Sequence, residues 1–225
     1  MAEYPRSVPG LGRAGNGGGT VSIAALERTR AAWIADEAPT VLECIHDRHV
    51  QLALWQRHRS PALDWLDSLD FDEIDDVQKN LAVESLASCL PGALIEAGYP
   101  DGPHTALSQE ISDLAHRYAQ VMEVGSIRMR LEIVETDACR KFHMDNVKAR
   151  LLMPLTEPGP QWIEADMRFD HQVNHLRAGD VGLFKGRIWA ETPAILHRSP
   201  PIAGTGVSRL LLVFDLASPA LTPET

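Results

Sequence analysis

The sequence predicts an α+β fold, in which a helical front half is followed by a back half of short strands that close into a barrel or sandwich. Three observations lead to this fold class. Apolar residues recur at helical spacing before Gly125, the pattern changes to strict alternation after it, and Gly/Pro turns separate the later strands with no helix between them. Helices between those strands would instead have indicated a βαβ sheet.

The chain of 225 residues suits one compact domain with an N-terminal extension. Residues 1–20 (MAEYPRSVPGLGRAGNGGGT) are rich in Gly and contain two prolines, so they bury too little apolar surface to fold alone. We expect a disordered tail there and a loosely attached helix over residues 21–37. Residues 1–40 are therefore predicted to be a flexible N-terminal extension.

Residues 41–124 are predicted to be a helical region that packs on the barrel. The segment VLECIHDRHVQLALWQR at its start is compatible with a strand followed by a short helix. Ser60 and Pro61 are typical of a helix N-cap and first turn, and helical apolar spacing follows them at Leu63, Leu66 and Leu69. Two more segments have this period, VQKNLAVESLASCL and TALSQEISDLAHRYAQVMEV, with breaks expected at Pro91-Gly92 and Gly102-Pro103.

Residues 125–218 are predicted to form the strands, and residues 219–225 a tail. In RMRLEIVET the apolar residues Met129, Leu131 and Ile133 alternate with charged ones, which is typical of a strand with one buried face. Further short strands are expected in VKARLLMPLT, QWIEAD, DVGLFKGRIW and SRLLLVFDL.

The composition favours a soluble, cytoplasmic protein. The chain is 44% hydrophobic and 23% charged, near the average for globular proteins, and its formal net charge is −10. We see neither a basic patch of the kind that binds nucleic acid nor an apolar stretch long enough to span a membrane, so neither partner is expected. The three cysteines form no close pair, which argues against a disulfide framework or a zinc ribbon.

A metal site is predicted from His143, Asp145 and His197. His143 and Asp145 are two residues apart in CRKFHMDNVKARLLMPL, at the start of an expected strand, where alternate side chains point to the same face. A third ligand is expected from His197 in AILHRSPPI, shortly before the last strand. Two imidazoles and a carboxylate on one face leave positions open for a cosubstrate and dioxygen, the arrangement of non-haem iron(II) oxygenases.

Arg209 is the fourth residue of this predicted site. It follows His197 by twelve residues and opens the apolar strand RLLLVFD, where its planar guanidinium would point inward and match the carboxylate of a dicarboxylic acid. A Gly-Asp turn and strand, AGDVGLFKG, lies between the two parts of the metal site.

The roles of several other polar residues are left open by the sequence. Cys139 suits a fourth, softer ligand that favours zinc, a redox-sensitive residue that lines the pocket, or a small buried apolar side chain. Three arginines also have two possible roles. Arg128 and Arg130 share one face of an expected strand, and Arg150 lies on the next strand. They could contact a substrate anion inside the barrel or lie on the polar face of an edge strand. His171 and His175 have a spacing that suits a metal only on a helix, and their segment is predicted to be an exposed loop or strand.

The stretch from Arg128 to Asp215 resembles the double-stranded β-helix, a cupin-like jelly roll, of the iron(II)- and 2-oxoglutarate-dependent oxygenases. That family has an HxD pair, a Gly-Asp strand with an aromatic residue, a distal His and then an Arg. The resemblance implies that His143, Asp145 and His197 bind iron, and that Arg209 holds the distal carboxylate of 2-oxoglutarate. It also implies hydroxylation of a small-molecule substrate.

Residues 41–216 more closely resemble a bacterial family of unknown function, some of whose members occur beside CobW-type metal-handling GTPases. The motifs that carry this resemblance are CRKFHMDNVKARLL, HRSPP and RLLLVFD. The resemblance implies a metal-handling GTPase as a partner.

Three functions are therefore considered. The first is an iron(II)- and 2-oxoglutarate-dependent oxygenase. The second is a zinc-binding or metal-homeostasis protein without turnover, which uses the same residues with Cys139 added. The third is a cupin-type isomerase or cosubstrate-independent dioxygenase in which Arg209 is structural.

Overall fold

The computed structural model of the chain describes residues 31–136, 138–166 and 172–217. The predicted disordered tail, His171 and the predicted tail at 219–225 lie outside the described residues. Within them, no helix is long and apolar enough to cross a membrane.

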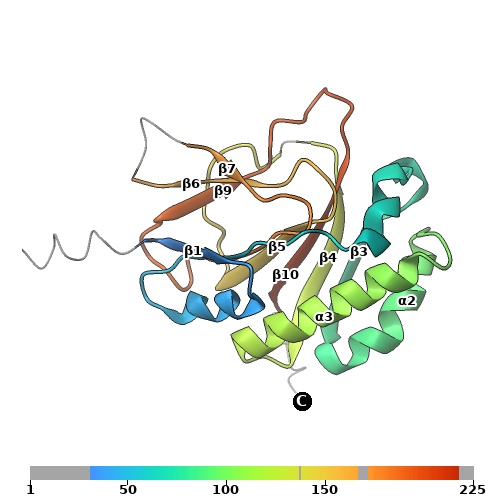
Figure 1. Cartoon of the computed structure of the whole chain (residues 1–225), viewed down its shortest axis with the longest axis horizontal. Coiled ribbons are helices and arrows are strands. Elements are labelled where there is room, and N and C mark those ends of the chain that lie inside the picture. Colours follow the sequence, from blue (N-terminus) through green and yellow to red (C-terminus); the bar gives the residue numbers. More distant parts are fainter. Residues whose placement is uncertain (1–30, 137, 167–171, 218–225) are drawn as a thin grey trace, which may run out of the picture. The chain divides into compact units, whose positions relative to one another are not determined.

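The largest element of the fold is a seven-stranded sheet in the order β1-β2-β8-β5-β10-β4-β3 (Figure 1). Within this sheet, β10 lies between β5 and β4 and pairs antiparallel with both. All pairs in the sheet are antiparallel except β1 and β2. Its strands are β1 (Trp33–Asp36), β2 (Leu52–Trp55), β3 (Val77–Ala82), β4 (Ser126–Val134), β5 (Ala149–Pro154), β8 (Val181–Lys185) and β10 (Arg209–Leu216).

A smaller sheet faces the large one. It contains β7 (Asn174–His175), β6 (Gln161–Glu164) and β9 (Ile195–Arg198), in that order. An isolated antiparallel bridge between His143 and His197 extends it on the β9 side. Apolar side chains from both sheets fill the space between them, among them Leu152, Trp162, Leu176, Phe184, Ile195 and Val213.

The back half of the chain winds alternately through the two sheets. From β4 in the large sheet it passes to the bridge at His143, back to β5, across to β6 and β7, back to β8, across to β9 and finally to β10. This winding of eight short segments is that of a jelly roll. The predicted double-stranded β-helix is therefore confirmed, and its segments run from Ser126 at the start of β4 to Leu216 at the end of β10.

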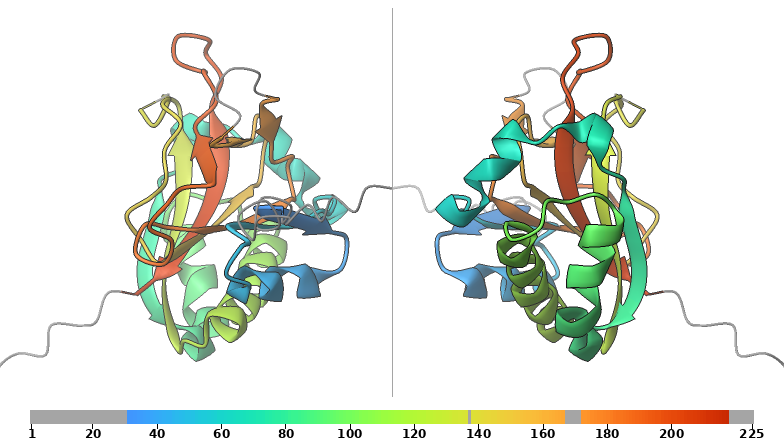
Figure 2. Two further views of the ribbon diagram at one scale, coloured as in Figure 1. Left: turned by 90° about the vertical axis from the view of Figure 1, so that its left-hand side faces the viewer. Right: turned by 90° about the vertical axis from the view of Figure 1, so that its right-hand side faces the viewer.

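Helices cover the outer face of the large sheet (Figure 2). Among the described residues, the α-helices are α2 (Leu86–Glu96) and α3 (His104–Met122), and Tyr118 of α3 donates a hydrogen bond to the carbonyl of Ala149 on β5. Met129 and Leu131 of β4 are fully buried beneath them, as the alternation in this strand predicts. Short 3-10 helices complete this layer, at Pro39–His46, Pro61–Ser68, Phe71–Glu73 and Val83–Ser85.

Several predictions for the front half are wrong. The segment VLECIHDRHVQLALWQR contains a helix followed by the strand β2, the reverse of the expected order. β2 is buried on both faces and so lacks the alternation that marks a strand. VQKNLA forms the strand β3 instead of part of a helix. Pro91 lies inside α2 and not at a break between helices, because the buried side chains of Leu90 and Leu94 pack this part of the helix against the core.

The predicted boundary at residue 41 is also too late. Residues 33–36 form β1 and residues 39–46 a 3-10 helix, although residues 1–40 were expected to be a flexible extension. The ring of Trp33 packs edge-on against Trp162 at 5.1 Å between centroids and donates a hydrogen bond to Glu164 at 3.0 Å. These contacts give the short strand β1 a fixed place on the barrel.

Candidate metal centre

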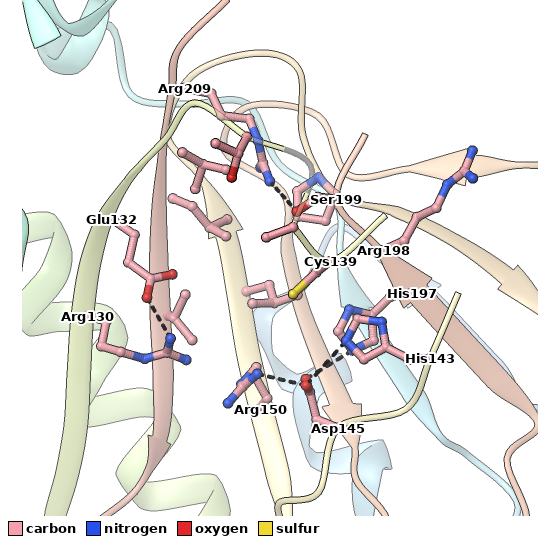
Figure 3. Close-up of a pocket in the computed structure, with 17 residues that line it drawn as sticks. Arg130, Glu132, Cys139, His143, Asp145, Arg150, His197, Arg198, Ser199 and Arg209 are labelled. Atoms are coloured by element: carbon pink, nitrogen blue, oxygen red, sulfur yellow. Dashed lines mark hydrogen bonds and ion pairs between the residues drawn. The ribbon is translucent and has the colours of Figure 1, made fainter. Parts of the chain in front are cut away.

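His143 and His197 are brought together by the backbone. The amide of each donates to the carbonyl of the other, at 3.0 and 2.9 Å, so the two residues face each other in an antiparallel bridge. Their rings lie 4.7 Å apart between centroids (Figure 3). A reciprocal pair of main-chain hydrogen bonds thus joins two residues that are 54 positions apart in the sequence.

Asp145 completes the group. Its Oδ1 lies 3.5 Å from Nε2 of His143 and its Oδ2 lies 3.0 Å from Nε2 of His197. One donor atom from each residue lies within 4.8 Å of the others. The HxD pair is not at the start of a strand as predicted: His143 is in the bridge, Asp145 is in the loop after it, and β5 begins at Ala149.

The loop that carries Asp145 is held against the end of β8. The carbonyl of Asp145 accepts the amide of Arg187 at 2.9 Å, and the amide of Gly186 donates to the carbonyl of Lys148 at 2.9 Å. A Cβ on Gly186 would meet the carbonyl oxygens of Val147 and Asp145. Glycine is therefore required here so that the two backbones can approach closely.

The charges of the group match those of a metal site. Burial alone would favour protonated Asp145, but the hydrogen bonds from His143 and His197 and the charge of Arg150 hold the pKa of Asp145 far below its usual range. The hydrogen bond to Asp145 raises the pKa of His143. Nδ1 of His143 lies 2.8 Å from the carbonyl of Lys141, which can only accept, so Nδ1 carries the proton and Nε2 is available to a metal.

Arg209 lines the same cavity as the three donors and is 1% exposed. Its terminal nitrogen Nη2 donates to the hydroxyl of Ser199 at 3.3 Å, while Nε and Nη1 have no partner in the part of the chain that the structure describes. Burial lowers the pKa of Arg209 to about 10, with Glu132 acting in the opposite direction. Nitrogens of a buried guanidinium without partners are costly, which suits an anionic ligand in the cavity.

The sequence left the direction of Arg130 and Arg150 open, and the structure places both inside the barrel with Asp215. Asp215 is 5% exposed and accepts hydrogen bonds from both arginines. Arg130 also pairs with Glu132 at 2.6 Å, on the wall of the cavity that faces the three donors (Figure 3). Sequence reasoning missed Asp215, although a carboxylate near the end of the apolar strand RLLLVFDL was a signal for a buried partner.

Cys139 is exposed and lines the cavity, so its interpretation as a buried apolar side chain is wrong. It is also not among the three residues whose donor atoms cluster within 4.8 Å. His175 is exposed on β7, as expected.

The donor set fits a divalent first-row metal. Two imidazole nitrogens and one carboxylate oxygen are the ligands that iron(II) and zinc accept, and all three side chains come from one end of the barrel. The cavity beside them has a volume of about 190 Å³. It is smaller than the roughly 300–1,000 Å³ pockets that hold drug-sized ligands.

Comparisons with known proteins give one family and a set of similar folds. Residues 36–215 match the model of a family described as "Protein of unknown function (DUF1826)". No curated protein matches the sequence. Among solved structures, the chain is similar to the dioxygenase for auxin oxidation of rice, with 13% identity, a TM-score of 0.45 and coverage of 84% of this chain and 83% of that chain.

Two further structures are similar in the same way. Dioxygenase for auxin oxidation 1 of Arabidopsis thaliana, in its binary complex with 2-oxoglutarate, has 10% identity, a TM-score of 0.49 and coverage of 84% of this chain and 93% of that chain. A prolyl-4-hydroxylase of Pseudomonas putida has 12% identity, a TM-score of 0.46 and coverage of 81% of this chain and 100% of that chain.

Proposed function

The chain belongs to the DUF1826 family. From the geometry of its candidate metal centre, we propose that it is a non-haem iron(II)- and 2-oxoglutarate-dependent oxygenase that hydroxylates a small molecule. One observation carries the proposal: a single cavity contains a His/Asp/His donor group and, away from it, a buried arginine with two nitrogens that lack partners among the described residues. A divalent metal and a dicarboxylate would satisfy both features together.

His143, Asp145 and His197 would hold the metal. The bridge between the two histidines sets their spacing before any metal arrives, so little ordering is required on binding. The low pKa of Asp145 keeps the carboxylate ionised at neutral pH. Because the described residues supply three protein ligands, positions remain open for the cosubstrate and for dioxygen.

Arg209 would hold the distal carboxylate of 2-oxoglutarate. Its guanidinium is kept in place by Ser199, and its Nε and Nη1 are free among the described residues to donate hydrogen bonds to a carboxylate. The bound metal and cosubstrate would supply the oxidising power for hydroxylation of an unactivated carbon. The protein would provide position and a dry environment, since Leu152, Leu211 and Val213 line the same cavity.

The proposal is tested by binding iron(II) and 2-oxoglutarate to the purified protein without oxygen. We expect a weak visible charge-transfer band that requires both additions. In Arg209→Ala, iron binding should persist, while the affinity for 2-oxoglutarate falls by about tenfold to a hundredfold, as for loss of a hydrogen bond to a charged group. Titration calorimetry with 2-oxoglutarate on the manganese-loaded protein measures this loss.

Arg198→Ala is the matched control. Arg198 also lines the cavity, but its guanidinium stacks on Phe142 at 4.3 Å and its Nε donates to Gln161 at 2.9 Å. Its removal should leave 2-oxoglutarate binding close to that of the wild type. Unchanged binding in Arg209→Ala would support a cupin-type enzyme in which Arg209 is structural. Absence of the band, together with zinc retained through purification, would support a zinc-binding protein without turnover.

A further inference from the structure

A buried ion-pair chain leads from the metal centre into the barrel. Asp215 lies on β10, and its neighbours across the two flanking strands are Arg150 on β5 and Arg128 on β4. Oδ1 of Asp215 accepts Nε of Arg150 at 2.7 Å and Oδ2 accepts Nη2 of Arg150 at 2.9 Å. Oδ2 also accepts Nη2 of Arg130 at 3.0 Å. The side chain of Asp215 is 7% exposed, so these contacts are well shielded from water.

This bidentate contact fixes the plane of the Arg150 guanidinium. Two of its nitrogens are used by Asp215, and the third, Nη1, lies 2.9 Å from Oδ1 of Asp145. A planar group with nitrogens on two sides can serve two carboxylates at once, which an ammonium group on a flexible stem does not do in the same geometry. Arg150 therefore joins a structural carboxylate to a carboxylate of the metal centre.

Asp145 depends on Arg150 for its orientation. Its other side-chain contacts are the Nε2 atoms of His143 and His197, and these nitrogens are themselves the proposed metal donors. Its loop is held at the end of β8 by main-chain hydrogen bonds and by Nε of Arg187, which donates to the carbonyl of Met144 at 3.2 Å, but none of these contacts reaches the carboxylate. Among the described residues, Arg150 is thus the side chain outside the ligand set that contacts this carboxylate.

We propose that Arg150, held by Asp215, is a positioning residue of the metal centre: it binds Oδ1 of Asp145 and so presents Oδ2 as the single carboxylate donor on the His197 side. This inference rests on the metal site of the proposed function. The stability of the barrel is a weaker explanation for the cluster, because a buried ion pair usually contributes little more than well-packed apolar residues of the same volume. Residues that hydrogen-bond to a metal ligand without binding the metal themselves, by contrast, commonly control metal affinity.

The test must remove the contact that orients Asp145 without changing the net charge near the metal. Arg150→Gln alone deletes a positive charge, which by itself would strengthen binding of a cation and oppose the loss of orientation. The double variant Arg150→Gln/Asp215→Asn deletes one charge of each sign, and Arg130 keeps Glu132 as a partner. In this variant we expect manganese(II) affinity to fall by about 10–100-fold.

A second measurement reports the coordination itself. The visible absorption of cobalt(II) bound in the site depends on the number and arrangement of its ligands, so it should change in the double variant. The matched control is Arg57→Gln/Glu110→Gln, which removes a part-buried ion pair that does not line the cavity and does not contact Asp145, Arg150 or Asp215. Its cobalt(II) spectrum and manganese(II) affinity should stay close to those of the wild type.

Arg150→Lys keeps the charge and tests the geometry. We expect it to fail to restore the wild-type affinity, because one ammonium group cannot hold both carboxylates. Arg150→Lys also serves as the test variant if circular dichroism shows that the double variant does not fold. A folded Arg150 variant with the affinity and cobalt(II) spectrum of the wild type would overturn the inference. If the wild-type protein itself binds no metal, or if His197→Ala binds it equally well, the proposed function fails instead.

Discussion

At the residue scale, a proton and a metal ion compete for the same nitrogen of His143. Nδ1 is directed to the carbonyl of Lys141, so Nε2 is the atom that either the proton or the metal occupies. Contact with Asp145 favours the protonated ring and raises its pKa above the ordinary value of 6.5. The apo site thus holds this proton to a higher pH than a free imidazole does.

Metal affinity should therefore increase with pH through and beyond pH 6.5, the ordinary pKa of histidine. Below the raised pKa each bound metal displaces one proton from His143, so affinity rises by up to about tenfold per pH unit and levels off only above that pKa. Calorimetric titrations with manganese(II) at a series of pH values, in buffers of different ionisation enthalpy, measure both the affinity and the proton released. An affinity that is already constant at pH 6.5 would contradict the prediction.

The residues of the site differ in how far the sequence reveals them. His143 and Asp145 are visible because their spacing is local. Arg209 is visible because it opens a clear apolar strand, and His197 because it precedes that strand in the sequence. Asp215 and the inward direction of Arg150 are not visible in this way. Both depend on which strand lies beside β10, and that neighbour is set by pairing across the sheet rather than by the sequence near either residue.

At the element scale, the turn after β8 positions the loop of the metal centre. Gly186 packs against the carbonyls of Val147 and Asp145, so any side chain there must displace the HxD loop. Backbone atoms cannot move aside as the end of a flexible side chain can. The effect of a substitution should thus reach Asp145 directly, although Gly186 is not itself a ligand.

Gly186→Ala should lower the affinity for manganese(II) by at least about tenfold, as for loss of a partner that orients a ligand. Gly92→Ala is its control, because Gly92 lies in α2 with nothing within 4 Å of the added Cβ. That change should leave metal binding alone and stabilise the protein by up to about 1 kcal/mol. Equal metal affinity in both variants would show that the close approach at Gly186 does not control the site.

The elements themselves were predicted best where a strand has one buried and one polar face. β4 has this alternation, and α3 has a clear helical period, so both were found. β2 lacks alternation because both of its faces are buried, and β1 has only four residues. The front half therefore resembled a helical region, although three of its segments complete the large sheet.

At the scale of the whole described domain, β1 connects the two sheets. It pairs with β2 in the large sheet, while Trp33 contacts Trp162 and Glu164 of β6 in the small sheet. Trp162 is in turn the partner of His197 across the β6–β9 pair. A strand that was predicted to belong to a flexible extension thus supports the sheet that carries a proposed metal ligand.

Trp33→Ala should lower the free energy of unfolding by about 1–3 kcal/mol, because it removes an edge-on aromatic pair and part of the apolar cover of the small sheet. Ile34→Ala, one residue on and 39% exposed, should change it by no more than about 0.5 kcal/mol. Urea unfolding of both variants without metal measures the difference. Since a ligand that binds only the folded state adds stability that grows with the logarithm of its concentration relative to Kd, saturating manganese(II) should raise the free energy of unfolding of Trp33→Ala and offset part of the loss. Equal losses in the two variants would mean that β1 acts only as an edge strand and does not join the sheets.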